Sequence, residues 1–92
     1  MKVDVVKRDG TLEVYDESKI VRVAEATGLD NIHAQAVAKD VTEWIKSNSL
    51  LKVTSLQIRD AVLSNLKKIN EASADLFTWY EGTKDNHPFE GN

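Results

Sequence analysis

The sequence predicts one α+β domain in which an N-terminal β-hairpin and a short third strand cap a four-helix bundle. Its length of 92 residues suits a single hydrophobic core, since domains contain about 50 to 200 residues. Residues that favour β-strands flank an Asp-Gly pair near the N-terminus. After residue 16, apolar residues recur at helical spacing in four segments, each preceded by a residue that can cap a helix.

The hairpin is predicted where two runs of β-forming residues, 3–6 and 12–15, flank Arg8-Asp9-Gly10-Thr11. A central Asp-Gly pair is the favoured sequence of a two-residue turn. We therefore expect two antiparallel strands joined at Asp9 and Gly10. The apolar stretch 50–53 is expected to add a short third strand just before Thr54.

The first two helices are predicted from their caps. Asp16 can accept a backbone N–H at the start of the first helix, and Gly28 supplies the left-handed residue that ends it. Asp30 or Asn31 can start the second helix, which is expected to be the longest. The residues expected to face the core are Ile20, Val23, Ala24 and Thr27 in the first helix, and Ala34, Val37, Ala38, Val41, Trp44 and Ile45 in the second.

Two further helices are predicted in the C-terminal half. Residues 54–57 read Thr-Ser-Leu-Gln, which has the form of a capping box, and Asn70 can cap the last helix. After Gly82 the chain is polar, contains the only proline and lacks periodicity, so residues 83–92 are expected to form a flexible tail. The residues expected to face the core are Ile58, Ala61, Val62, Leu66 and Ile69, then Ala72, Leu76, Trp79 and Tyr80.

Composition excludes several classes of protein. The formal net charge of -3 disfavours nucleic acid as the main partner, because non-specific duplex binding depends on a basic surface. The absence of cysteine removes disulfides, thiolate metal sites and cysteine nucleophiles. No apolar run approaches the roughly 20 residues that span a bilayer, and the charged N-terminus is not that of a secretion signal. We therefore expect a cytoplasmic protein that does not enter the membrane.

No catalytic constellation is visible in the sequence. His33 and His87 have no spacing that pairs them with a nucleophile or with metal ligands. The four glycines are scattered and do not form a Walker loop. The sequence therefore predicts a protein that is not an enzyme.

Cations gather near the predicted hairpin and helix starts. Lys7 and Arg8 flank the turn, while Lys19 lies in the first turn of a helix, where the helix dipole favours an acid. Arg59 has the same unusual position in the third helix. A bound polyphosphate would explain these positions. From composition alone the alternative is stronger, namely that Lys7, Arg8 and Lys19 form weak surface ion pairs with neighbouring acids.

The order and spacing of these residues resemble a known family. Val5-Val6-Lys7-Arg8-Asp9-Gly10, followed by Glu13, Tyr15, Asp16 and Lys19-Ile20, resembles the opening signature of the ATP-cone, a nucleotide-binding regulatory domain found in many ribonucleotide reductases. The resemblance continues through residues 54–58 to Ala74, Phe77 and Tyr80, and it covers roughly residues 2 to 81. It implies an ATP-cone-like domain over residues 1–82.

The resemblance also implies a nucleotide site between the β cap and the helices. In it, Lys7, Arg8 and Lys19 hold phosphates or the edge of the base, Val5 contacts the adenine, and Glu13 and Asp16 bind polar groups of the nucleoside. Glu81 stands where relatives often have an arginine, a role that Lys84 could take over. The nucleotide-binding residues that the resemblance implies are Val5, Lys7, Arg8, Glu13, Asp16, Lys19, Thr54, Ser55, Arg59 and Lys84.

The function implied by the resemblance is non-catalytic. The chain is expected to bind ATP or dATP, with or without magnesium, and the nucleotide is expected to control oligomerisation or docking to a partner similar to a ribonucleotide reductase. The sequence contains neither a reductase domain nor a zinc ribbon, which favours a free-standing protein. The alternative is a helical interaction module that keeps the fold without binding nucleotide. DNA binding through the third helix is the weakest reading, because Asp60 follows Arg59 there.

Overall fold

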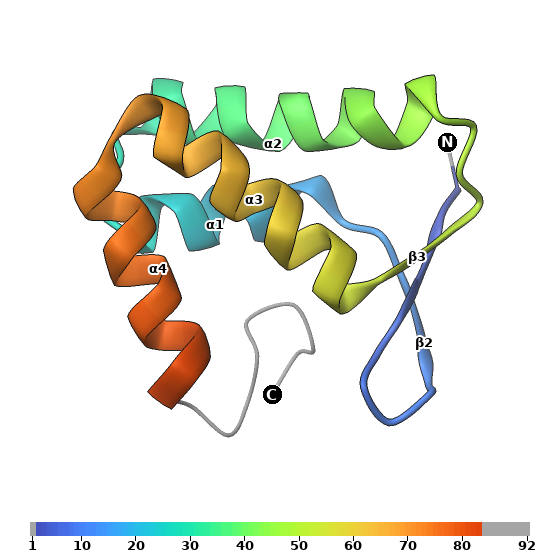
Figure 1. Cartoon of the computed structure of the whole chain (residues 1–92). Coiled ribbons are helices and arrows are strands. Elements are labelled where there is room, and N and C mark those ends of the chain that lie inside the picture. Colours follow the sequence, from blue (N-terminus) through green and yellow to red (C-terminus); the bar gives the residue numbers. More distant parts are fainter. Residues whose placement is uncertain (1, 84–92) are drawn as a thin grey trace.

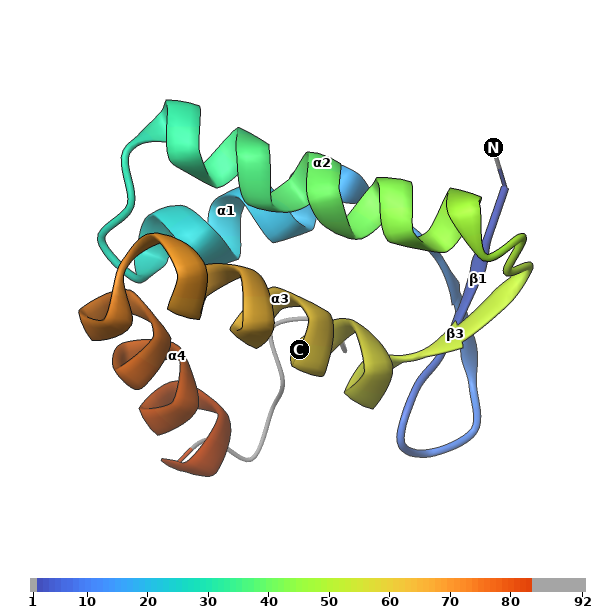
Figure 2. The same cartoon turned by 45° about the horizontal axis from the view of Figure 1, so that its top comes forward.

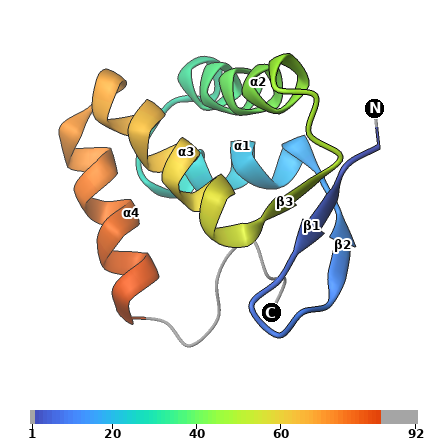
Figure 3. The ribbon, with the colours of Figure 1, turned by 45° about the vertical axis from the view of Figure 1, so that its right-hand side comes forward.

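The structure is a computed structural model that describes residues 2–83, and it confirms the α+β class with a three-stranded sheet and four helices (Figure 1). The sheet lies at one end of the molecule, and α3 continues directly from β3 (Figure 3). The elements are β1 (Asp4–Val6), β2 (Leu12–Val14), α1 (Glu17–Ala26), α2 (Asn31–Ser47), β3 (Lys52–Thr54), α3 (Ser55–Ile69) and α4 (Glu71–Thr83).

The sheet has the order β2-β1-β3, so β1 is its central strand. β2 pairs with β1 in the antiparallel direction and β3 pairs with it in parallel, which places Glu13, Val5 and Val53 side by side in one row. Val5 and Val53 are buried, whereas Leu12 and Val14 on the other face of β2 are each 55% exposed. Because side chains alternate along a strand, Glu13 lies on the face that meets the helices.

The hairpin turn is longer than predicted. The Gly10 N–H donates to the Lys7 carbonyl, and the Lys7 N–H donates to the Thr11 carbonyl, so three residues form the loop instead of two. Gly10 has a φ of 87°, a left-handed conformation that glycine adopts without strain. Asp9 closes the turn, because its Oδ1 accepts hydrogen bonds from the backbone and the hydroxyl of Thr11.

The predicted helix caps are confirmed. Asp16 accepts from the Ser18 N–H at the start of α1, and Asp30 accepts from the His33 N–H at the start of α2. Thr54 and Gln57 form the reciprocal capping box of α3. At the start of α4, the side chain of Asn70 accepts from the Ala72 N–H at 2.9 Å. Each cap satisfies a backbone donor that has no partner within its helix.

The helices pack in chain order, α1 on α2, α2 on α3 and α3 on α4. α4 lies at the end away from the sheet, as the view in Figure 2 also shows. That the sheet caps a four-helix bundle stays a prediction. The buried hydrophobic core consists of Val3, Val5, Ile20, Ala24, Leu29, Ala34, Val37, Ala38, Val41, Ile45, Val53, Ile58, Val62, Leu66, Ala74 and Phe77.

The predicted core face of α4 is wrong. Ala72, Leu76, Trp79 and Tyr80 were expected to point inward, but the first three are exposed, with Trp79 at 58%, and Tyr80 is half-buried. Among residues 71–81 of this helix, Ser73, Ala74 and Phe77 are buried. The Ser73 hydroxyl donates to the Thr27 carbonyl at 3.0 Å, which ties this face to the end of α1. Because α4 has apolar residues on both sides, periodicity alone does not identify the side that packs on α3.

The predicted tail, residues 83–92, lies outside the described residues except for Thr83, the last residue of α4. The boundary between a domain at 1–82 and a flexible tail therefore stays a prediction. Within residues 2–83, no helix is long and apolar enough to cross a membrane.

Candidate functional site

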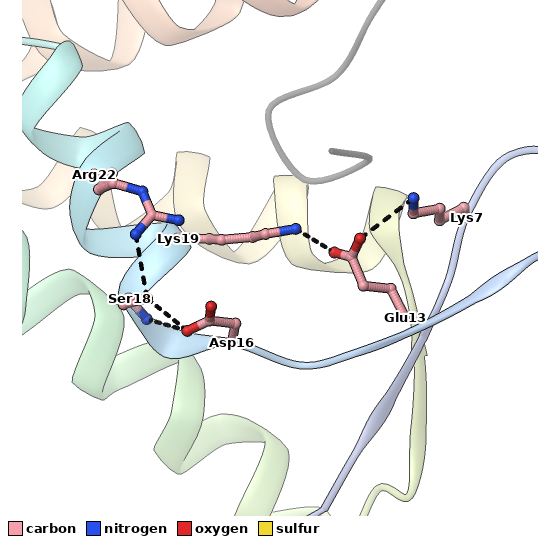
Figure 4. Close-up of polar contacts among 6 residues, drawn as sticks. All are labelled: Lys7, Glu13, Asp16, Ser18, Lys19 and Arg22. Atoms are coloured by element: carbon pink, nitrogen blue, oxygen red, sulfur yellow. Dashed lines mark hydrogen bonds and ion pairs between the residues drawn. The ribbon is translucent and has the colours of Figure 1, made fainter. Parts of the chain in front are cut away.

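Two lysines from different parts of the chain meet at one carboxylate beside the sheet (Figure 4). Lys19 Nζ, from α1, donates to Glu13 Oε1 at 2.5 Å. Lys7 Nζ, just after β1, lies 3.3 Å from Glu13 Oε2. All three side chains are between 22% and 26% exposed. This Lys7–Glu13–Lys19 cluster has one more positive than negative charge.

The local sequence explains why these residues meet. Glu13 is on the helix-facing side of β2, opposite Val5 of the central strand. Tyr15 and Asp16 connect β2 to α1, and Lys19 follows in the first turn of that helix. The short connection therefore places the Lys19 ammonium above the face of β2 that holds Glu13.

The cluster borders a small hollow between the sheet, α1 and α3. Its cavity volume of about 10 Å³ is roughly the space that one water molecule requires. The hollow combines apolar walls with the Glu13 and Lys19 charges at its margin. It is lined by Val5, Glu13, Tyr15, Asp16, Lys19, Ile20 and Ile58.

The N-termini of α1 and α3 are occupied by their own caps. Asp16 Oδ1 accepts from both the Ser18 N–H, at 3.0 Å, and the Ser18 hydroxyl, at 2.6 Å, and Arg22 Nη1 lies 3.4 Å from that hydroxyl (Figure 4). These hydrogen bonds hold the pKa of Asp16 below its usual range. Thr54 Oγ1 accepts from the Gln57 N–H in the same way. A phosphate group near the hollow would therefore depend on the lysines more than on helix N–H groups.

The sequence-predicted site residues do not all gather at the hollow. Val5, Glu13, Asp16 and Lys19 line it, and Lys7 reaches it through Glu13. The other described candidates lie elsewhere. Arg8 is exposed in the hairpin turn, Thr54 and Ser55 stand at the start of α3, and Arg59 pairs with Asp60 at 2.9 Å beside a groove between α3 and α4. Lys84 lies outside the described residues.

Three wall residues of the hollow were not among the predicted site residues, namely Tyr15, Ile20 and Ile58. Ile20 and Ile58 carry the helical periodicity, which identifies them as core residues and says nothing of a ligand. Tyr15 is an aromatic residue at a fixed place in the motif, directly after β2, and this position was the available signal.

A larger groove between α2 and α3 is a poorer place for an anion. Its volume is about 830 Å³, and Trp44 contributes an aromatic surface to it. Its charged lining residues are Asp40, Glu43, Asp60 and Lys68, so carboxylates outnumber ammonium groups. Negative potential at this groove would repel a polyphosphate.

Glu13 titrates below the usual range for a glutamate. The hydrogen bond from Lys19 lowers its pKa most, burial opposes the effect, and Lys7 lowers it further. A carboxyl whose pKa is lower in the folded than in the unfolded chain stabilises the fold at pH values above its ordinary pKa of about 4.5. That stabilisation is lost as the pH falls through the folded pKa.

Glu13→Gln should therefore reduce the acid sensitivity of the fold. At pH 7 we expect the free energy of unfolding to fall by no more than about 1 kcal/mol, because the three groups are partly exposed. Between pH 7 and about pH 3, the variant should lose less stability than the parent chain. Urea unfolding at the two pH values measures both effects. Equal acid sensitivity in parent and variant would contradict the ionic role of Glu13.

Metal ligands do not cluster in the part of the chain that the structure describes. Residues 2–83 contain no group of three or more His, Asp or Glu side chains placed to hold a metal ion. His33 instead hydrogen-bonds through Nδ1 to its helix cap, Asp30, at 2.7 Å.

Comparison with known families decides the relationship of this chain. The family described as the ATP cone domain matches residues 3–78, which include both strands of the hairpin, the Lys7–Glu13–Lys19 cluster and every wall of the hollow. The chain belongs to the ATP-cone family. Members of this family generally bind ATP or dATP. The resemblance predicted from the sequence motif is thus confirmed.

Curated relatives carry the name transcriptional repressor NrdR. The protein of Trichodesmium erythraeum (strain IMS101) is 28% identical over 93 residues, covering 92% of this chain and 53% of the relative. That of Synechococcus sp. (strain RCC307) is 29% identical, covering 92% and 58%. That of Rippkaea orientalis (strain PCC 8801 / RF-1) is 30% identical, covering 90% and 51%. This ATP-cone chain therefore spans about half the length of the curated relatives it matches.

These relatives bear on two expectations from the sequence. They are named as repressors and not as enzymes, in agreement with the expected regulatory class. The expectation that nucleic acid is disfavoured as a partner is not supported, because the relatives are named as regulators of transcription. Net charge describes the average surface of this ATP-cone domain, and it does not identify the partners of the larger proteins that contain one.

Proposed function

We propose that this ATP-cone is a non-catalytic regulatory domain that binds ATP or dATP at the hollow between the sheet, α1 and α3. The observation that carries the proposal is the Lys7–Glu13–Lys19 cluster beside an apolar hollow, in a chain of the ATP-cone family. The cluster supplies charge for phosphates, and the hollow supplies apolar walls for a base.

In this proposal, the phosphates replace Glu13 as the partner of the lysines. Lys7 and Lys19 are already held within reach of one anionic group, so little side-chain order is lost when a phosphate takes its place. Arg8 adds a cation from the turn. Glu13, once released, becomes an acceptor for ribose hydroxyls or the adenine amino group.

The adenine would rest against the apolar walls of the hollow, with Val5 on the sheet side and Ile58 on α3. The hollow must widen to admit it, since its volume of about 10 Å³ holds roughly one water molecule. The sheet would then act as the cap over the helices. Thr54, Ser55 and Arg59 lie on the same helix as Ile58 and would be reached by a nucleotide that extends along α3.

The output of binding is proposed to be a change in self-association or in docking to a partner. The exposed apolar side of α4, which includes Leu76 and Trp79, is a candidate contact surface. Nucleic acid is included among the candidate partners because the relatives are named transcriptional repressors. We place the protein in the cytoplasm, where ATP and dATP are available.

Calorimetric titration with ATP, dATP, ADP and GTP, each with and without magnesium, tests the proposal. We expect saturable binding of ATP or dATP, weaker binding of GTP, and no phosphate release during the experiment. Magnesium should alter affinity only through the nucleotide, since residues 2–83 provide no cluster of metal ligands. Absence of heat with both adenine nucleotides would overturn the proposal, and phosphate release that depends on Lys7 would overturn its non-catalytic part.

One observation favours a second candidate, an interaction module that keeps the fold without binding nucleotide. In the free structure, the hollow is nearly filled, and Glu13 already neutralises part of the lysine charge. Titration separates the two candidates, because the second predicts no nucleotide binding while the exposed side of α4 still docks a protein partner.

A further inference from the structure

A chain of hydroxyl groups joins the hollow to helix α2. Tyr15 is half-buried and lines the hollow, and its hydroxyl oxygen lies 2.8 Å from Thr42 Oγ1 on α2. The Thr42 hydroxyl donates to Glu17 Oε1, in the first turn of α1, at 2.5 Å. Since threonine has one hydroxyl proton and gives it to Glu17, the Tyr15 hydroxyl is the donor to Thr42. The chain runs Tyr15 to Thr42 to Glu17.

Among the uncharged walls of the hollow, Tyr15 is the one that can move at least cost. Of the lining residues, only Tyr15 and Asp16 lie outside helices and strands. Asp16 is held by its two hydrogen bonds from Ser18. Ile20 and Ile58 belong to the core and are 1% and 2% exposed. Among these uncharged walls, a ligand that widens the hollow would therefore displace the Tyr15 ring.

Displacement of the Tyr15 ring would change the hydrogen bonding of Thr42 on α2. Thr42 is only 7% exposed, so its hydroxyl group has little access to water that could replace Tyr15 as a donor. When Tyr15 withdraws, the Thr42 oxygen loses its donor, and a rotation of the Thr42 side chain toward another partner would also break its hydrogen bond to Glu17. Glu17 and Thr42 both line the outer groove between α1 and α2. The rearrangement therefore reaches the outer surface of these helices.

We propose that Tyr15 is a positioning residue that reports occupancy of the hollow to helix α2: a bound adenine nucleotide displaces the Tyr15 ring and breaks the Tyr15–Thr42–Glu17 chain. The proposal rests on the proposed function, since it requires a nucleotide in the hollow. It adds a route by which binding on the sheet side changes the α1–α2 groove on the outer surface.

Tyr15→Phe tests the route, because it removes the hydroxyl group and keeps the ring. The readout is the NMR signal of the Thr42 methyl group. The methyl group of Thr78 on α4, which takes no part in the Tyr15–Thr42–Glu17 hydrogen bonds, is the internal reference. In the parent, saturating ATP should shift the Thr42 signal and leave the Thr78 signal in place. In free Tyr15→Phe, the Thr42 signal should already lie near the ATP-bound position, and ATP should move it little further.

Calorimetry on the same samples separates this proposal from the proposed function. Tyr15→Phe should bind ATP at least as tightly as the parent, because the ring is retained and binding no longer has to break the hydrogen bond to Thr42. If the parent binds ATP but its Thr42 signal does not move, or if Tyr15→Phe responds as the parent does, the route through Tyr15 is wrong while nucleotide binding stands. If the parent shows no binding heat with ATP or dATP, both proposals fail.

A second variant changes Thr42, the residue of the Tyr15–Thr42–Glu17 hydrogen bonds that lies on α2. Thr42→Val removes the hydroxyl group that bridges Tyr15 and Glu17, with little change in side-chain shape. Thr78→Val is the matched control. Among the described contacts, the Thr78 hydroxyl bonds only the Ala74 carbonyl within α4. The ATP-dependent shift of the Glu17 amide signal should be lost in Thr42→Val and retained in Thr78→Val. Retention of that shift in both variants would overturn the proposed route.

Discussion

Replacing both Lys7 and Lys19 with alanine should abolish the thermal stabilisation that ATP gives to the parent chain. A ligand that binds only the folded state at a hundredfold excess over its Kd stabilises it by about 2.7 kcal/mol. In a domain of this size each kcal/mol moves the melting temperature by roughly 4 to 8 °C, so the parent shift should be on the order of 10 °C. The variant lacks the two cations that Glu13 holds beside the hollow.

Lys67→Ala with Lys68→Ala is the matched control for this pair. It removes the same amount of charge from the exposed last turn of α3, away from the hollow. Each variant is compared with its own nucleotide-free sample by differential scanning calorimetry, so any change in basal stability cancels. An ATP-induced shift of equal size in both pairs would mean that the phosphates bind elsewhere.

Phe77→Ala should destabilise the domain more than any surface substitution on α4. Phe77 is 1% exposed and is the largest fully buried side chain of the described residues. Replacing a buried phenylalanine with alanine typically lowers the free energy of unfolding by roughly 3 to 5 kcal/mol, because apolar burial is lost and a cavity remains. That is a large share of the roughly 5 to 15 kcal/mol by which domains are stable.

Trp79→Ala is the control on the same helix. It removes a larger side chain, but one that is 58% exposed, so the free energy of unfolding should change by only about 0.5 kcal/mol. Urea unfolding of the two variants measures the difference. If Trp79→Ala were the more destabilising, the side of α4 that packs on α3 would be the one expected from the sequence and not the one in the structure.

Local chemistry made much of the fold predictable. Asp16, Asp30 and Thr54 each cap the helix that the sequence assigns to them, because a capping interaction involves residues only two or three positions apart. The runs of β-forming residues 3–6 and 12–15 likewise predicted the two strands of the hairpin. The hairpin loop was less predictable, since Asp9-Gly10 suits both a two-residue turn and the three-residue loop that is found.

Features that depend on tertiary contacts were not predictable. The buried side of α4 follows from its packing on α3, and the pairing of Arg59 with Asp60 depends on side-chain orientation at the start of α3. The motif brought Glu13 and Lys19 into one candidate site, but it did not reveal that they are bonded to each other in the free chain. Tyr15 was visible as a motif residue, whereas its link to Thr42, 27 positions away, required the packing of α2 against the start of α1.

An ATP titration followed by backbone amide NMR tests the central proposal most directly, because it locates the bound nucleotide on the chain. We expect the largest shifts on three sides of the hollow, at Val5 in β1, at Lys19 in α1 and at Ile58 in α3. Saturable shifts at these residues would support the nucleotide site. Largest shifts at Trp44 and Asp60, in the groove between α2 and α3, or no saturable shift at any residue, would contradict it.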